Sequence, residues 1–247
     1  MSLLAHIQHQ RNTHGRGFAL LLDPDEVDLE RLPQRLAQAE QSGVHYIFVG
    51  GSLVTSGDTA AVVQAAKAAT RLPVLLFPGH AAQVVPQADA LLYLSLISGR
   101  NPEYLIGQHV ASAHRIKQSG IEVIPTGYML IDGGRPTSVS YISNTQPIPA
   151  DKPDIAAATA LAGTLMGQQL IYMDAGSGAQ QPVSAQVISR VRKEIDVPLI
   201  VGGGIRTPEA AASALQAGAD VVVVGNALEP DASDALMNAM AGAIKAI

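Results

Sequence analysis

Short apolar runs alternate with amphipathic stretches along the chain. The first run, Gly17–Asp23, precedes Asp28–Gly43, which has the spacing of a helix that ends on glycine. The runs are continuously apolar, as is typical of strands buried on both faces of a parallel sheet. Seven more runs follow: YIFVGG, PVLLFPG, ADALLYLSLIS, IEVIPTGYMLI, LIYMDAGSG, PLIVGGG and VVVVGNAL. This βα alternation predicts an α/β fold, a closed (β/α)8 or TIM barrel, and the 247 residues suit one such domain over residues 1–247.

Two segments depart from the regular alternation. Only residues 79–87 separate the third and fourth runs, whereas a parallel crossover needs about a dozen residues, and Pro86 would break a helix there. We therefore expect a modified barrel in which the third outer helix is missing or replaced by an extended segment. The polar stretch 132–152 is expected to be a long loop after the fifth strand, and loops of this length are usually functional or interfacial.

Composition narrows the class of protein. The formal net charge is −5 and no run of basic residues appears, which argues against a nucleic-acid partner. The absence of cysteine excludes disulfides, thiolate metal sites and a cysteine nucleophile. The sequence has neither a signal-peptide pattern nor an apolar stretch of membrane-spanning length, so we expect a cytoplasmic enzyme with at most peripheral membrane contact. The seven histidines form no convincing ligand set and are expected mostly on the surface.

Glycines follow the last two apolar runs. Gly203 and Gly204 precede the helical pattern TPEAAASALQAG, and Gly225 and Asn226 follow VVVV. Glycine lets the backbone approach an anion closely, and a helix N-terminus adds free N–H groups and a partial positive charge. In barrels, the loops after strands seven and eight frequently bind phosphate. The pattern therefore predicts a phosphate site, with plain tight turns as the alternative.

Tyr172 and Asp174 lie two residues apart in the sixth run, so they share one face of a strand. At the carboxyl end of a barrel strand, that face looks into the active site. A phenol and a carboxylate there could hold the hydroxyls of a polyol, and the carboxylate could accept a proton from one of them. Gly176, Ser177 and Gly178 form a second loop suited to an anion. The alternative is that Asp174 only caps the following turn.

Asp23 ends the first apolar run, on the same rim of the predicted barrel, in the sequence DPDE. A carboxylate at the mouth of a phosphate-binding barrel suits Mg²⁺, which combines one or two carboxylates with substrate phosphates and waters. Ser52, after the second run, could supply a hydroxyl to the metal or belong to a further anion loop. Taken alone, DPD is common in turns, and it is the glycine loops opposite that favour the metal interpretation.

Seven motifs together resemble one known family: LLDPD, VGGS, RNPEYLIG, PTGYMLIDGG, YMDAGSGA, VGGGIRTPEAA and VVVGNALE. The sequence resembles, over residues 17–228, the geranylgeranylglyceryl phosphate synthase family, which includes the heptaprenylglyceryl phosphate synthases; the last two motifs also occur in many phosphosugar barrels. The resemblance implies a barrel with one outer helix replaced. It further implies a prenyltransferase in which the C3 hydroxyl of sn-glycerol 1-phosphate displaces diphosphate from an all-trans polyprenyl diphosphate, with geranylgeranyl diphosphate as the expected donor, and forms an ether.

Carried over by position, the resemblance implies roles for the matching residues. Asp23 and Ser52 match the family's Mg²⁺ ligands, and Asp174 and Tyr172 are the expected catalytic residues. Many members carry glutamate where this chain has Asp174, so Asp174 either acts as the base or only orients the hydroxyl. The residues implied to bind glycerol 1-phosphate are Tyr172, Met173, Asp174, Ala175, Gly176, Ser177, Gly178, Gly203, Gly204, Gly225 and Asn226.

Two other functions would use the same glycine loops. A phosphosugar isomerase would predict a second phosphate site or a catalytic Asp/Lys pair on strands one and five, and the fifth run offers Tyr128 and Asp132 and no lysine. A non-catalytic binding protein would hold a phosphate ligand without turnover. A polyprenyl tail needs an apolar groove, for which Tyr93, Tyr104, Tyr128 and Leu130 are candidates, with a plain core role as the alternative. Family members are commonly dimers or larger, so we expect a homo-oligomer.

Overall fold

Eight parallel strands close into a barrel in the computed structural model, which describes residues 1–13, 15–225, 228 and 234–247. The strands pair in chain order, and β1 closes the ring with β8 in a register that begins at Gly17↔Val221. They are β1 Gly17–Leu22, β2 Tyr46–Val49, β3 Val74–Leu76, β4 Ala90–Leu96, β5 Glu122–Leu130, β6 Leu170–Asp174, β7 Leu199–Gly202 and β8 Val221–Val224. The predicted TIM barrel is confirmed.

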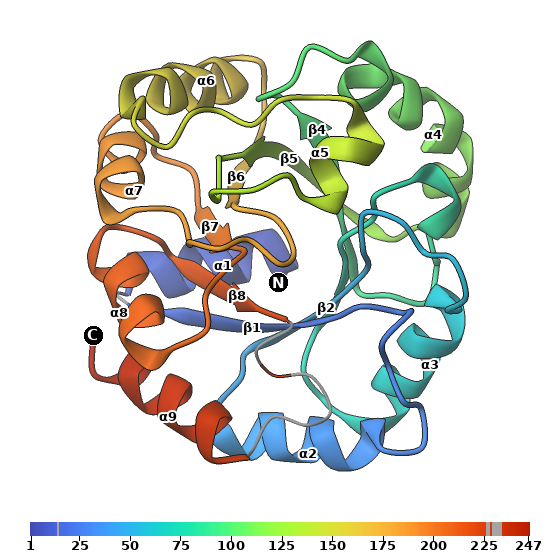
Figure 1. Ribbon diagram of the computed structural model, residues 1–247. Coiled ribbons are helices and arrows are strands. Elements are labelled where there is room, and N and C mark those ends of the chain that lie inside the picture. Colours follow the sequence, from blue (N-terminus) through green and yellow to red (C-terminus); the bar gives the residue numbers. More distant parts are fainter. Residues whose placement is uncertain (14, 226–227, 229–233) are drawn as a thin grey trace.

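A ring of helices surrounds the barrel, which Figure 1 views roughly along its axis. They are α2 Leu32–Ser42, α3 Thr59–Ala69, α4 Gln108–Ser119, α6 Pro153–Leu165, α7 Ala185–Arg192, α8 Pro208–Gln216 and α9 Asp234–Lys245. Helix α2 begins later than the predicted Asp28, and Pro33 stands in its first turn, where no N–H is needed. In the described part of the chain, no helix has both the length and the apolar character that crossing a bilayer requires.

The unit between β3 and β4 has no full outer helix. A single 3₁₀ turn, η1 (Ala81–Gln83), and extended chain connect the two strands. The Gln83 side chain ties this connection to the end of β2, because its Nε2 donates to the Gly51 carbonyl and its Oε1 accepts from the Gly79 N–H. The expected replacement of the third outer helix is confirmed.

Three further helices were not predicted as separate elements. A π-helical turn, η2 (Glu103–Gly107), runs directly into α4. Helix α5 (Ser138–Ser143) interrupts the stretch 132–152, so the prediction of one continuous loop there is wrong; six residues are too few to show a helical period. Helix α1 (Leu3–Asn12) precedes β1. In Figure 1, α1 lies behind the barrel and α5 in front of it.

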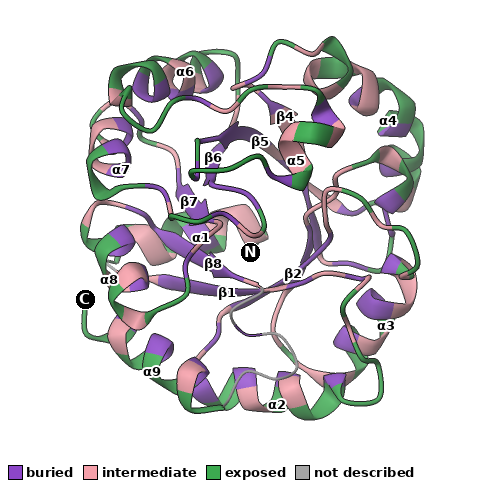
Figure 2. Ribbon diagram, viewed as in Figure 1, coloured by how far each residue is buried: buried purple, intermediate pink, exposed green. Residues whose placement is uncertain are grey.

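Side chains alternate between the barrel interior and the layer beneath the helices. On β6, Leu170 and Tyr172 belong to the interior cluster, whereas Ile171 and Met173 pack beneath the outer helices. Figure 2 shows strands that are mostly buried and helices in which buried residues alternate with intermediate and exposed ones. Inward-facing residues near the carboxyl ends of the strands are therefore those that can reach a cavity in the barrel mouth.

Helix α1 covers the amino-terminal end of the barrel. Ile7 is buried among the interior side chains. The N–H groups of Leu3 and Leu4 donate to the Glu122 carboxylate at the start of β5, over 2.7 and 2.9 Å. A carboxylate at this position satisfies free N–H groups of the first helical turn and interacts favourably with the helix dipole.

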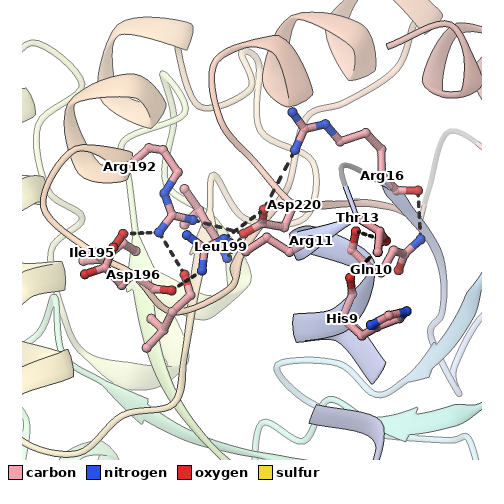
Figure 3. A network of polar contacts seen from close by, with 11 residues as sticks. His9, Gln10, Arg11, Thr13, Arg16, Arg192, Ile195, Asp196, Leu199 and Asp220 are labelled. Atoms are coloured by element: carbon pink, nitrogen blue, oxygen red, sulfur yellow. Dashed lines mark hydrogen bonds and ion pairs between the residues drawn. The ribbon is translucent and has the colours of Figure 1, made fainter. Parts of the chain in front are cut away.

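The buried carboxylate of Asp220 secures the same end of the barrel (Figure 3). It accepts hydrogen bonds from the Leu199 N–H, at 2.8 Å, and from Arg192 Nη1, at 3.0 Å. Arg11 Nε and Arg16 Nη1 lie 3.6 and 3.9 Å from its other oxygen. Asp220 directly precedes β8, so one side chain connects α1, the segment before β1, α7 and β7.

Candidate active site

A cavity opens at the carboxyl-terminal end of the barrel. The loops after β1, β2, β6, β7 and β8 and the segment 136–142 contribute most of its lining. The predicted site residues in this lining are Asp23, Ser52, Tyr172, Asp174, Ser177, Gly178, Gly203, Gly204 and Gly225. Asn226 lies outside the described residues. The fold thus brings the predicted metal and phosphate residues to one cavity.

Three predicted substrate-binding residues do not line this cavity. Met173 and Ala175 pack in the layer beneath the outer helices, because side chains alternate along β6 and its extension. Gly176 is buried and donates its N–H to Asp174. Any contact of Met173 or Ala175 with a ligand in the cavity must therefore come from backbone atoms.

Asp174 ends β6, and only 7% of its surface is exposed. Its Oδ2 accepts a 2.6 Å hydrogen bond from the Tyr128 hydroxyl, and its Oδ1 accepts a 2.8 Å bond from the Gly176 N–H. Burial raises the pKa of Asp174, and the two hydrogen bonds oppose this rise because they favour the ionised form. Asp174 therefore caps the following turn and also presents a carboxylate whose pKa is displaced in the direction that a general base requires.

Tyr128 and Tyr172 form an aromatic wall with Phe77. The two tyrosines are register partners on β5 and β6, with ring centroids 5.6 Å apart, and Phe77 stacks on Tyr172 at 4.9 Å. Burial, with the charge of Asp174, raises the pKa of both phenols well above the ordinary value, so both hydroxyls are protonated donors at neutral pH. The contact between Tyr128 and Asp174 was not predicted from the sequence, because it depends on the register of β5 against β6.

Gly203 lets the loop after β7 approach the loop after β6. Its φ of 77° lies in the left-handed region that favours glycine. A Cβ at this position would lie 2.6 Å from the Gly176 nitrogen and 2.7 Å from the Ala175 nitrogen, and would also collide with Asp174 Oδ1. Gly203 therefore makes a tight turn that brings the backbone of the loops after β6 and β7 together at the cavity, where the anion site is predicted.

Asp23 follows β1 and is partly buried at the edge of the cavity. Its Oδ1 accepts a 3.1 Å hydrogen bond from the Asp25 N–H, and a Cβ on Gly51 would lie 3.1 Å from its Oδ2. The carboxylate thus lies against the backbone that leads into Ser52. Burial raises the pKa of Asp23; the charges of Asp25 and Glu26 add to the rise, and the Asp25 N–H opposes it. A cation beside Asp23 would relieve this burial of negative charge.

The donor set around Asp23 fits a metal that is shared with a substrate. The described residues contain no group of three or more His, Cys, Asp or Glu side chains placed to hold an ion. Asp23 and Ser52 offer one carboxylate and one hydroxyl to the cavity. This set fits Mg²⁺, which keeps waters and takes oxygens from substrate phosphates, and does not fit a structural zinc ion with four protein ligands.

The Asp25 carboxylate is hydrogen-bonded to the loop between β2 and α3. Its carboxylate accepts hydrogen bonds from the N–H groups of Thr55, Ser56 and Gly57, at 2.9, 3.0 and 2.6 Å, and from the Thr55 hydroxyl at 2.9 Å. These bonds, that of Gly57 foremost, hold the pKa of Asp25 well below its ordinary value. Asp25 therefore fastens this loop to the turn after β1.

A second, apolar cavity adjoins the first, between β3, β4 and α4. Three of the four groove candidates line it, Tyr93, Tyr104 and Tyr128, whereas Leu130 lies in the barrel core. His109 also lines it and is buried, with its ring edge-on to Tyr93 at 4.5 Å, so it is not among the expected surface histidines. Burial lowers the pKa of His109, which keeps its ring neutral at physiological pH and the cavity free of charge on that side.

The sequence as a whole matches one protein family. The model of the PcrB family covers residues 9–244. The chain belongs to this family. It is 54% identical over 231 residues to the geranylgeranylglyceryl phosphate synthase of Chitinophaga pinensis, with 94% of this chain and 91% of that protein covered. It is 44% identical over 222 residues to the synthase of Thermococcus kodakarensis, with 90% and 87% covered. The family resemblance predicted from the sequence is confirmed.

Solved structures agree with the assignment to the PcrB family. The (S)-3-O-geranylgeranylglyceryl phosphate synthase from Thermoplasma acidophilum, in complex with its substrate sn-glycerol-1-phosphate, is 35% identical and superimposes with a TM-score of 0.92 over 100% of both chains. An N-acetylmannosamine-6-phosphate 2-epimerase from Clostridium perfringens is 14% identical over 86% of this chain and 87% of its own, with a TM-score of 0.57. The second likeness shows the barrel fold alone.

Proposed function

We propose that this chain is a prenyltransferase that joins sn-glycerol 1-phosphate to an all-trans polyprenyl diphosphate through an ether bond. The C3 hydroxyl oxygen attacks the allylic carbon of the donor, expected to be geranylgeranyl diphosphate, as the bond from that carbon to the diphosphate breaks. The names of the relatives and the ligand of the Thermoplasma acidophilum structure support this pair of substrates. The observation that carries the proposal is a buried carboxylate, Asp174, in a cavity edged by glycine loops.

Glycerol 1-phosphate is proposed to bind with its phosphate at the loops after β6, β7 and β8. Gly178, Gly203 and Gly204 line the cavity there and leave room for a phosphate against the backbone. The Tyr172 phenol, protonated beside Asp174, can donate to a glycerol hydroxyl. Holding the substrate at its far end places the C3 hydroxyl for attack, and placement of this kind lowers the barrier through orientation.

Asp174 is proposed to accept the proton of the C3 hydroxyl as the ether bond forms. The two protein hydrogen bonds hold its carboxylate in one orientation, through Tyr128 on one oxygen and the Gly176 N–H on the other. Because burial raises its pKa, the carboxylate takes up a proton more readily than a solvent-exposed one does. Tyr128 acts in this scheme as a positioning residue for Asp174.

Asp23 and Ser52 would hold Mg²⁺ at the opposite side of the cavity. When bound, the ion supplies positive charge that neutralises the diphosphate leaving group. The role of this chain is to place Asp23 and Ser52 on one edge, which Asp25 does by fastening the Ser52 loop to the Asp23 turn. A diphosphate at this edge would lie where the polar and apolar cavities share Ser52, Phe77 and Ile142. The polyprenyl tail would then enter the apolar cavity.

A homo-oligomer is part of the proposal. Tyr141 in α5 and Ile155, Leu165 and Met166 on and just after α6 are exposed large hydrophobic residues, with exposed fractions between 50% and 85%. Burying such side chains against a second copy is favourable. Light scattering of the purified chain would give the mass of the assembly, and a monomer at micromolar concentration would contradict this part of the proposal.

Incubation of the purified chain with sn-glycerol 1-phosphate, Mg²⁺ and radiolabelled prenyl diphosphates of graded length tests the function. We expect a lipid-extractable ether phosphate and released diphosphate, with one donor length preferred. Asp174→Asn is the matched control, because it keeps the shape of the side chain and removes the base. Binding of glycerol phosphate without product from any donor would make the chain a binding protein, and turnover of a phosphosugar would make it an isomerase.

A further inference from the structure

The ionisable side chains that line the polar cavity are strongly unbalanced in charge. Among the described residues, the lining contains three carboxylates, Asp23, Asp25 and Asp174, and a single cationic side chain, Arg206. The proposed substrates are both anions, and the proposed Mg²⁺ would lie at the Asp23 edge. At the glycine loops, backbone N–H groups would therefore have to offset the charge of Asp174 and of the phosphate by themselves unless Arg206 takes part. Arg206 immediately precedes Thr207, which caps α8, so its charge adds to the positive end of that helix.

Arg206 is held beside the loop that follows β6. Its Nη2 donates a 2.7 Å hydrogen bond to the Ala179 carbonyl, one residue beyond Gly178. This bond uses one of five guanidinium donors, so the others remain for a ligand. Ser177, Gly178, Gly203 and Gly204 line the same part of the cavity. The arginine therefore stands at the glycine-loop side and not at the Asp23 side.

A second guanidinium flanks the same loop. Arg135, from the segment after β5, lies so close to Gly178 that a Cβ on this glycine would collide with Arg135 Nη2. Gly178 has a φ of 74°, so the backbone also excludes other residues here. Arg135 is exposed and, within the described residues, makes no ion pair that would consume its charge. Arg206 and Arg135 thus flank the loop of four small residues, 175–178, that lies between Asp174 and Ala179.

We propose that Arg206, assisted by Arg135, supplies the charge that recognises the phosphate dianion of glycerol 1-phosphate, so that this half of the site binds its ligand without a metal. The cavity is then divided: arginine and backbone N–H groups bind the monoester, and the Asp23 edge needs a cation to bind the diphosphate. Guanidinium groups suit phosphate because their donors match two of its oxygens at once. This inference rests on the proposed function, since it assigns the ligand of the same site.

Calorimetric titration with sn-glycerol 1-phosphate, in EDTA and without a prenyl donor, tests the inference. We expect wild-type binding to be unchanged by EDTA, and Arg206→Gln to raise the Kd about tenfold or more, as expected for losing a charge-assisted hydrogen bond. Arg206→Lys keeps the charge and should lose less. Arg71→Gln, on an exposed loop before β3, is the matched control and should bind as the wild type does.

Three readouts separate ligand recognition from a structural effect of Arg206. In Arg206→Gln the KM for the prenyl diphosphate should stay within about twofold, and the salt dependence of glycerol phosphate binding should become shallower. Arg135→Gln should weaken binding by a smaller factor without changing the melting temperature, because its guanidinium supports no other described residue. Unchanged Kd in Arg206→Gln, or loss of wild-type binding in EDTA, would overturn the inference while leaving the proposed function standing. A wild-type chain that binds no glycerol phosphate under any condition would instead overturn the proposed function.

Discussion

Substitution of Asp220 by asparagine should destabilise the barrel from the end opposite the active site. The Asp220 side chain is 5% exposed and lies between Arg192 at 3.0 Å, Arg11 at 3.6 Å and Arg16 at 3.9 Å. Asparagine keeps the size of the side chain, and its carbonyl oxygen can still accept from the Leu199 N–H. The change therefore removes the charge and places an amide NH2 toward Arg11 and Arg16, where the wild type has an acceptor oxygen.

The size of the stability loss follows from the burial of Asp220 and of its three arginine partners. Breaking a fully buried ion pair costs about 3–5 kcal/mol. The arginine side chains are 18%, 28% and 25% exposed, so water partly solvates them when the carboxylate is lost, and we expect about 2–3 kcal/mol here. For a chain of this size, each kcal/mol lowers the melting temperature by about 2–4 °C, which gives a decrease of about 4–12 °C.

Thermal and urea unfolding of Asp220→Asn would measure this loss. Asp28→Asn is the matched control: its ion pair with Arg31, at 3.4 Å, joins side chains that are 43% and 72% exposed, and its loss should change stability by less than about 0.5 kcal/mol. Turnover should be unaffected in both variants at temperatures where they are folded. An Asp220→Asn midpoint no lower than that of the control would refute the reasoning, because the arginines would then need no buried counter-charge.

Three substitutions test the active site, and a fourth tests the loop that Asp25 holds. Asp174→Asn should lower kcat by about 10²-fold or more, with little change in the glycerol phosphate Kd from calorimetry; wild-type turnover would remove Asp174 as the base. Tyr128→Phe removes a donor that favours the ionised carboxylate, so the pKa of Asp174 rises and the acidic limb of the pH–rate profile moves to higher pH; an unmoved limb would show that Tyr128 does not set this ionisation. Asp23→Asn should raise the Mg²⁺ concentration needed for half-maximal turnover and leave metal-free glycerol phosphate binding intact. Asp25 has a lowered pKa in the folded state, so its carboxylate stabilises the fold above the pKa of an unfolded aspartate, about 4, and this stabilisation is lost as the pH falls through the lower folded value. The difference in melting temperature between wild type and Asp25→Asn should therefore become smaller as the pH is lowered. A difference that does not depend on pH would contradict the argument.

The fold could be predicted from the sequence where the hydrophobic pattern repeats along the chain. Eight continuous apolar runs identified eight strands, and the nine residues 79–87 with Pro86 were too short a link for an outer helix. It was insufficient for helix α5, whose six residues show no period, and for α1, whose apolar positions are few. The sequence analysis expected most histidines on the surface; His109 is buried because the side of α4 that carries it faces the apolar cavity.

Side-chain contacts between neighbouring strands and loops were the part of the site that could not be predicted from the sequence. Tyr128 and Asp174 are 46 residues apart, and only the register of β5 against β6 joins the phenol to the carboxylate. Arg206 and the Ala179 carbonyl meet in the same way, through the loops of neighbouring strands. Met173 and Ala175 illustrate the converse: a family motif names consecutive residues, whereas a strand turns every second side chain away from the ligand.

The short link between β3 and β4 has a consequence for what the barrel can contain. The apolar cavity is lined by this link, through Pro78, Ala81 and Val84, on one side and by α4, through His109 and Ser112, on the other. In a regular barrel a helix would occupy that space and convert it into packed core. Grafting a helix of ordinary length between Gly79 and Gln87 should therefore leave the ring of strands closed but fill the apolar cavity proposed for the polyprenyl tail. The absence of a full helix from this link is thus what leaves the cavity open in the fold.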